Sequence, residues 1–121
     1  MKVIIAGGRD FNNPALIAST MDQLDFLVSE VVCGDARGAD TQGAEWAFRN
    51  GIAVKHFPAD WDRLGNRAGF IRNEQMAQYA DYLVAFWDGE SHGTKHMIDT
   101  MTKMGKHGTV VIYEKRPELI F

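Results

Sequence analysis

The chain has 121 residues, a formal net charge of −3 at pH 7, and a composition that is 45% hydrophobic and 24% charged. These values fit one domain over residues 1–121 and exclude a disordered chain, a collagen-like repeat and a coiled coil. No apolar run approaches the roughly 20 residues of a membrane helix, so we expect no membrane partner and no signal peptide. The single cysteine, Cys33, cannot form an internal disulfide, which favours a reducing, cytoplasmic location.

Five short runs rich in apolar and β-branched residues predict the strands. Most of these runs are continuously apolar, which is typical of strands covered on both faces. The predicted strands are residues 3–6, 31–33, 52–54, 82–86 and 110–113.

Four helical patterns lie between the predicted strands. Asn13 is the expected N-cap of the first, a proline follows it, and apolar residues at helical spacing continue to Val28. The others are expected over residues 39–47, 66–79 and 97–104. Alternation of strand and helix predicts an α/β fold, a three-layer sandwich with a parallel five-stranded sheet in the order 3-2-1-4-5. That order places a crevice between the first and fourth strands.

Glycines, arginines and aspartates follow the ends of the predicted strands. In an open parallel sheet, ligands bind outside the carboxyl ends of the strands. Fixed guanidinium groups on an acidic protein suit a small anionic ligand better than a long polyanion, and bulk nucleic-acid binding is not expected. Five of the seven arginines fall in these loops or at the start of the third helix: Arg9, Arg37, Arg63, Arg67 and Arg72.

Two glycine-containing loops each open a predicted helix. In residues 34–40, free backbone N–H groups and the helix dipole would attract phosphate, with Arg37 adding a bidentate contact. Residues 89–94 repeat this arrangement and add the hydroxyls of Ser91 and Thr94. The alternatives are a tight turn that merely needs glycine in the first loop and Ser91 as a helix N-cap in the second. Together the two loops predict a ligand with a phosphate and a ribose, or with two phosphates.

These loops supply the predicted ligand-binding residues, with Trp87 placed to flank a base or ribose. The histidines show no metal-ligand spacing and Cys33 has no partner cysteine, so we predict no metal site and no required cofactor. Five aspartates could hold Mg²⁺ together with a phosphate ligand: Asp10, Asp35, Asp40, Asp60 and Asp88. The predicted ligand-binding set is Gly7, Gly8, Arg9, Asp10, Gly34, Asp35, Arg37, Gly38, Asp40, Trp87, Asp88, Gly89, Ser91, Gly93 and Thr94.

Five phrases of the sequence resemble the YspA-type (cpYpsA-related) branch of the SLOG superfamily. They lie in order along nearly the whole chain, at residues 6–11, 34–40, 57–61, 72–76 and 86–95. The resemblance implies a single SLOG-type, Rossmann-like domain that senses or processes a nucleotide or a nucleotide derivative. Relatives form dimers, so a homo-oligomer is expected, and the apolar end of residues 115–121 would dock on the domain or on a partner.

Two relatives within that superfamily imply different activities. The LOG phosphoribohydrolases cleave the N-glycosidic bond of nucleoside monophosphates with an arginine and a glutamate. Arg72 and Met76 match the arginine phrase, which makes Arg72 the candidate catalytic residue, but Met97 stands where the glutamate is expected. DprA, which binds single-stranded DNA, carries a phrase similar to residues 36–40. We therefore expect binding of a nucleotide-derived ligand such as an ADP-ribose-like molecule, and the alternatives are N-glycosidic or phosphoanhydride hydrolysis and single-stranded nucleic-acid binding.

Overall fold

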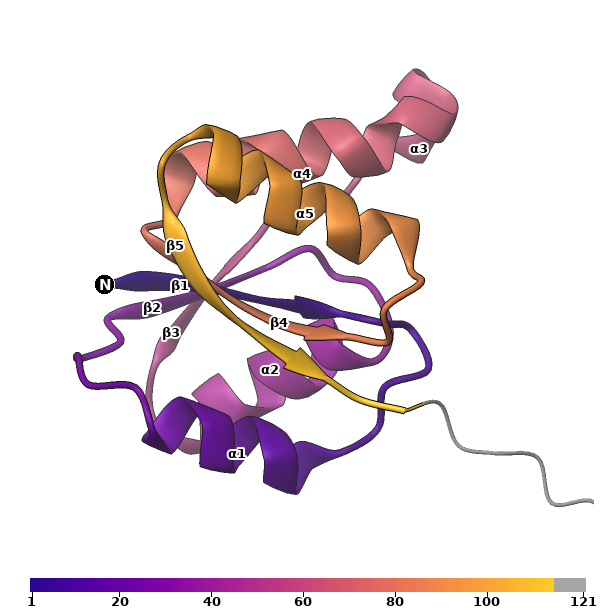
Figure 1. Ribbon diagram of the computed structural model, residues 1–121. Helices are drawn as coiled ribbons and strands as arrows, with labels where there is room; N and C mark the ends of the chain where they lie inside the picture. Colours follow the sequence, from indigo (N-terminus) through magenta and orange to yellow (C-terminus); the bar gives the residue numbers. More distant parts are fainter. Residues whose placement is uncertain (115–121) are drawn as a thin grey trace, which may run out of the picture.

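Five parallel strands form one sheet in the computed structural model, which describes residues 1–114 (Figure 1). The strand order is β3-β2-β1-β4-β5, which confirms the predicted order. Because β1 lies beside both β2 and β4, the chain reverses its direction of travel across the sheet between these two neighbours. The strands are β1 (Lys2–Gly7), β2 (Glu30–Cys33), β3 (Ala53–His56), β4 (Tyr82–Trp87) and β5 (His107–Ile112).

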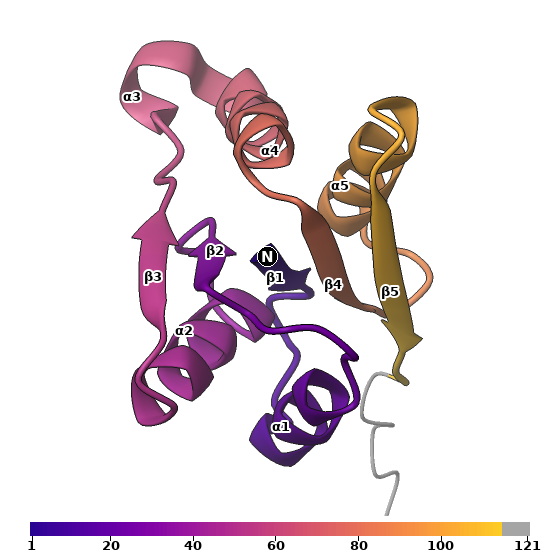
Figure 2. The same cartoon turned by 90° about the vertical axis from the view of Figure 1, so that its left-hand side faces the viewer.

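Helices cover both faces of the sheet and complete a three-layer sandwich (Figure 2). On one face lie α1 (Pro14–Asp22) and α2 (Ala39–Arg49), and on the other lie α4 (Ala68–Tyr79) and α5 (His92–Lys103). A short helix, α3 (Trp61–Leu64), and a 3₁₀ turn, η1 (Gly65–Arg67), lead into α4. The α/β sandwich predicted from the alternating pattern is therefore confirmed.

The hydrophobic core consists of two clusters, one on each face of the sheet. Ile5 and Phe86 belong to the cluster beneath α1 and α2, whereas Ile4 and Met97 belong to the cluster beneath α4 and α5. Successive side chains of a strand point to opposite faces, so continuous apolar runs in β1 and β4 supply both clusters. The edge strands β3 and β5 are largely exposed, so the expectation of strands covered on both faces holds only in the centre of the sheet.

Element boundaries differ from several of the sequence predictions, among them those of α1, α3 and β5. Helix α1 ends at Asp22, and Leu24 and Val28 pack against the core from the connection that follows it. The unpredicted helix α3 has Asp60 as its N-cap, whose carboxylate accepts the backbone N–H of Arg63 at 3.3 Å. Strand β5 begins earlier than predicted because backbone pairing with β4 extends beyond the apolar run.

The described helices are all short. None within residues 1–114 combines the length and the hydropathy of a membrane span. The predicted docking of the apolar chain end concerns residues 115–121, which lie outside the described residues.

Candidate functional site

A cavity of about 520 Å³ opens at the carboxyl ends of β1 and β4, where the strand order reverses. Ligands of open α/β sheets bind at this position. Residues from four separate parts of the chain line it, since the loops after β1, β2 and β4 meet the middle of α4 and the first turns of α5 there. Ten predicted site residues lie in its wall: Gly7, Gly8, Arg9, Asp10, Asp40, Arg72, Asp88, Ser91, Gly93 and Thr94.

The N-terminus of α5 contributes Ser91, Gly93 and Thr94 to this cavity. Ser91 is the N-cap residue, but its side chain makes no capping hydrogen bond, and the first turn of α5 contains no acidic residue. The first N–H groups of a helix have no partner within the helix and carry its positive dipole end. This helix end therefore lacks the side-chain acceptor that usually satisfies it and remains suited to an anion.

The loop after β2 differs from the sequence expectation. The side chain of Asp40 turns back and accepts the N–H groups of Gly34 and Ala36, at 3.1 and 3.4 Å. The N–H of Ala39, at the start of α2, donates to the carbonyl of Gly8 at 3.3 Å. The phosphate contacts predicted for this loop are thus replaced at these amides by the protein's own oxygen atoms.

Asp88 plays a similar part in the loop after β4. One of its carboxylate oxygens accepts the N–H groups of Glu90 and Ser91, each at 2.8 Å. The second predicted phosphate loop is therefore held by its own aspartate before α5 begins, and the part suited to an anion is the first turn of the helix rather than residues 89–91.

Asp40 is a buried carboxyl group in the wall of the cavity, with 5% of its surface exposed. Burial raises its pKa from 3.8 to about 6, and the opposing charge of Arg72 and the two backbone N–H groups only partly offset that rise. The carboxyl group of Asp40 therefore ionises at about pH 6, closer to neutral pH than the carboxyl group of an ordinary aspartate.

Arg72, the candidate catalytic residue, lies on α4 and is held by two neighbours. Its guanidinium donates to the carbonyl of Gly34 and, at 3.3 Å, to the side-chain oxygen of Asn73. Asn73 in turn donates to the carbonyl of Gly93 and to Nδ1 of His96, each at 3.2 Å. Burial lowers the pKa of His96, which keeps that nitrogen available as an acceptor. Asn73 thus joins Arg72 to the N-terminus of α5.

Close packing explains the two glycines at the end of β1 and directly after it. A Cβ at Gly7 would overlap the carbonyl oxygen of Phe86, and a Cβ at Gly8 would overlap the hydroxyl of Tyr113. That hydroxyl donates to Asp10 at 2.7 Å, and burial together with this hydrogen bond raises the pKa of Tyr113. Tyr113 therefore orients one of the cavity's carboxylates.

A second cavity of about 290 Å³ adjoins the first, and both share Arg9, Ala36 and Arg72 as lining residues. The predicted residues Gly34, Asp35 and Arg37 line this second cavity.

The remaining predicted residues, Gly38, Trp87 and Gly89, line neither cavity. The indole N–H of Trp87 donates to the carbonyl of Ser91 at 3.1 Å, so this side chain braces the loop after β4. Asp60, one of the aspartates considered for Mg²⁺, serves instead as the N-cap of α3.

Several lining residues were not predicted from the sequence: Ala6, Ala36, Asn73, Met76, Glu90 and Met97. Asn73 carried one signal in the sequence, since it directly follows Arg72 in the phrase at residues 72–76 that resembles the family. Met97 belonged to the apolar pattern of the fourth predicted helix and Met76 to the arginine phrase, and both are almost completely buried.

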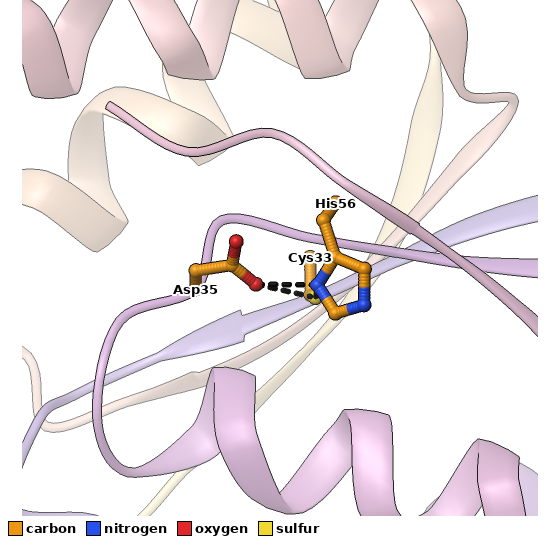
Figure 3. A group of neighbouring side chains, drawn as sticks. All are labelled: Cys33, Asp35 and His56. Carbon is orange, nitrogen blue, oxygen red and sulfur yellow. Dashed lines mark hydrogen bonds and ion pairs between the residues drawn. The ribbon is translucent and has the colours of Figure 1, made fainter. Parts of the chain in front are cut away.

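Cys33, Asp35 and His56 also lie together, although sequence spacing indicated no metal site (Figure 3). Cys33 and His56 are paired residues of the neighbouring strands β2 and β3. The two residues are 23 positions apart along the chain, so the sequence does not show that they are close in space. Burial is the main cause that raises the pKa of the Cys33 thiol to about 12, so the thiol is protonated at neutral pH.

A family model and a phage protein each match part of the chain. A family model described as the YspA, cpYpsA-related SLOG family matches residues 1–64. The Gene 61 protein of Mycobacterium phage D29 is 40% identical over 81 residues, which cover 62% of this chain. The aligned part spans 65% of that protein, slightly less than two thirds of its length. No solved structure matches the chain. The family match includes the loops after β1, β2 and β3, whereas Arg72 and the start of α5 lie beyond it.

Proposed function

Because the chain belongs to the YspA, cpYpsA-related SLOG family, we propose that it binds a nucleotide or a nucleotide-derived ligand, such as an ADP-ribose-like molecule. The observation that carries this proposal is the combination of arginines, an uncapped helix N-terminus and several carboxylates around one cavity of about 520 Å³. Cavities that hold small molecules usually measure about 300–1,000 Å³. The volume therefore accommodates a ligand of nucleotide size.

Each kind of group suits a different part of such a ligand. Arg9, Arg72 and the first turn of α5 would bind phosphate, because guanidinium groups and helix N–H groups donate to its oxygens. Asp10 and Asp88 would accept hydrogen bonds from ribose hydroxyls. Their carboxylates are also oxygen ligands of the kind that Mg²⁺ prefers, so a phosphate-bound Mg²⁺ would fit beside them.

The experiment is a thermal-shift and calorimetric titration with AMP, ADP-ribose, NAD and cyclic dinucleotides, with and without Mg²⁺. A ligand at 100 times its Kd stabilises a folded protein by about 2.7 kcal/mol, which is roughly a 10 °C rise in Tm for a chain of this length. We expect at least one of these ligands to give such a rise. Unchanged Tm values with all of them at millimolar concentration would contradict the proposal.

The variant Arg9→Ala tests whether the ligand binds in these cavities, because Arg9 lines both of them and its side chain is exposed. We expect this variant to keep the wild-type Tm without ligand and to bind the ligand at least about tenfold more weakly, since it loses a charge-assisted contact. Arg49→Ala is the matched control, because Arg49 is an exposed arginine at the end of α2 that lines neither of these cavities. Equal weakening in both variants would indicate a general charge effect rather than this site.

Hydrolysis of the ligand's N-glycosidic bond is a second candidate, favoured by Asp40. A carboxyl group with a pKa of about 6 can donate a proton at neutral pH, and it lines the same cavity as Arg72. Met97 offers no proton at the position of the glutamate in the LOG phrase. A chromatographic assay would detect the released base, and Asp40→Asn is expected to retain ligand binding and lose turnover. Absence of product from the wild-type protein, or equal turnover in Asp40→Asn, would exclude this mechanism.

A further inference from the structure

Three side chains that can ligate a metal converge at the carboxyl ends of β2 and β3 (Figure 3). Sγ of Cys33 lies 3.4 Å from Nδ1 of His56 and 3.6 Å from Oδ1 of Asp35. The same Nδ1 lies 2.5 Å from the same Oδ1. The three contacts therefore involve only three atoms, one from each residue, and these atoms form a small triangle.

This geometry differs from that of a catalytic cysteine. A nucleophilic triad needs the thiol on one imidazole nitrogen and the carboxylate on the other, so that the ring can pass a proton between them. Here both neighbours contact Nδ1, which cannot perform the two roles at once. Cys33 is also only 1% exposed, which prevents a substrate from reaching its sulfur.

The triangle is close to the spacing of ligands around one zinc ion. With Zn–S near 2.3 Å and Zn–N and Zn–O near 2.1 Å, a tetrahedral ion places sulfur about 3.6 Å from each partner and nitrogen about 3.4 Å from oxygen. Both distances to sulfur agree within about 0.2 Å. Only the contact of 2.5 Å between His56 and Asp35 must widen, by about 0.9 Å, and both side chains are partly exposed and can rotate.

We propose that Cys33, Asp35 and His56 bind a Zn²⁺ ion. Thiolate, imidazole and carboxylate together form a ligand set that zinc accepts and that Mg²⁺ does not favour. Three protein ligands leave the fourth tetrahedral position open, as in catalytic rather than structural zinc sites. The side chains of His56 and Asp35 are 54% and 40% exposed, so water or a ligand oxygen can reach that position.

Binding requires a defined exchange of protons. The thiol of Cys33 releases its proton to solvent as sulfur bonds to the ion, and Nδ1 of His56 binds the ion in its unprotonated form, with the ring proton on Nε2. The carboxylate of Asp35 exchanges its hydrogen bonds from these two groups for a bond to the ion. No other part of the protein has to change its protonation state.

The experiment is titration of the full chain, stripped of metal with EDTA, with Co²⁺ as a spectroscopic substitute for Zn²⁺. We expect one equivalent to produce a thiolate-to-cobalt charge-transfer band and the intense visible bands of tetrahedral cobalt, both of which one equivalent of Zn²⁺ removes. Absence of the thiolate band, with the protein folded by circular dichroism, would overturn the proposal. Because the titration uses the metal alone, its outcome is independent of nucleotide binding.

Variants of the two exposed ligands identify the site without disturbing the core. His56→Ala and Asp35→Asn are each expected to weaken Zn²⁺ binding at least tenfold. Asp35 has a φ of 61°, and asparagine tolerates that region well, so the second variant keeps the loop conformation. His107→Ala is the control, because His107 lies at the amino end of β5, at the opposite edge of the sheet, and should bind Zn²⁺ like the wild type. Wild-type affinity in His56→Ala would refute the assignment.

Discussion

Gly38 lies so close to Gly8 that a Cβ at Gly38 would overlap the Gly8 carbonyl oxygen. The contact joins the loop after β2 to the loop after β1, so the walls of the main cavity support one another. A sequence interpretation assigned this glycine to phosphate binding, whereas its contacts assign it to packing between loops. The absent side chain makes room for the protein's own backbone rather than for a ligand.

The first prediction concerns the stability that this contact provides. Gly38→Ala should lower the free energy of unfolding by more than about 2 kcal/mol, because it combines backbone strain at a φ of 78° with a collision against the loop after β1. Gly51→Ala is the matched control, since Gly51 has a φ of 66° but a Cβ at this position would meet no atom within 4 Å, and it should cost about 1–2 kcal/mol. Urea unfolding measures both values. Equal losses would show that strain alone, and not the contact, requires glycine at position 38.

The second prediction separates folding from ligand binding at the start of α5. A Cβ at Gly93 would meet nothing within 4 Å, so Gly93→Ala should fold with at least wild-type stability. The new methyl group would occupy space in front of the first turn of α5, so we expect nucleotide affinity to fall about tenfold. Calorimetry gives the affinity, and the Tm without ligand is the internal control. Unchanged affinity would place the ligand away from this helix end.

The third prediction concerns the pH dependence that Asp40 confers. Because its pKa rises from 3.8 to about 6 on folding, the folded protein binds more protons than the unfolded chain between these values. Stability should therefore fall as pH rises through this window, and the cost persists at pH 7. Asparagine keeps an oxygen for the N–H groups of Gly34 and Ala36, so Asp40→Asn should be more stable at pH 7 by about 2–3 kcal/mol.

Denaturant unfolding of the wild type and Asp40→Asn at several pH values tests whether stability falls as pH rises. The stability difference between Asp40→Asn and the wild type should be small near pH 4 and should grow up to pH 7. Contributions from histidines cancel in this comparison because both proteins contain them. A wild-type protein that gains stability relative to the variant as pH rises would contradict the prediction.

The fourth prediction concerns Lys106, whose side chain caps the carboxyl end of α4. Its ammonium group donates to the carbonyls of Ala77 at 2.6 Å and Ala80 at 2.7 Å, and more distantly to that of Gln78. Lys106→Met should lower the free energy of unfolding by about 1–2 kcal/mol, since it removes a charge from the negative end of the helix dipole and leaves part-buried carbonyls without a donor.

Lys103→Met provides the comparison for that measurement, because Lys103 is exposed in the last turn of α5. Its loss should cost no more than about 0.5 kcal/mol. Thermal unfolding of both variants at the same pH gives the difference, and a loss in Lys103→Met as large as that in Lys106→Met would rule out a specific role for the part-buried lysine.

The α/β fold and the strand order could both be predicted from the amino-acid sequence. Buried strands such as residues 82–86 and helices such as residues 39–47 are encoded in local apolar patterns, and right-handed crossovers leave few ways to arrange them. The same logic located the cavity, because the loops after parallel strands must meet at one edge of the sheet. Gly7, Asp10 and Gly93 lie at or after the ends of such strands and were therefore predicted as neighbours, whereas Arg72 was predicted as a candidate catalytic residue from the resemblance to the LOG phosphoribohydrolases.

The hydrogen-bond partners of these residues, in contrast, could not be predicted from the sequence. Hydrogen-bond partners depend on differences of a few tenths of an ångström in the distances between loops, and no local sequence pattern encodes these distances. The hydrogen bonds from the Gly34 and Ala36 N–H groups to Asp40 could therefore not be predicted. The meeting of Cys33 and His56 depends on the register between β2 and β3, which packing across the whole sheet sets. Local periodicity thus specified which elements form, whereas contacts between distant segments specified which atoms face each other.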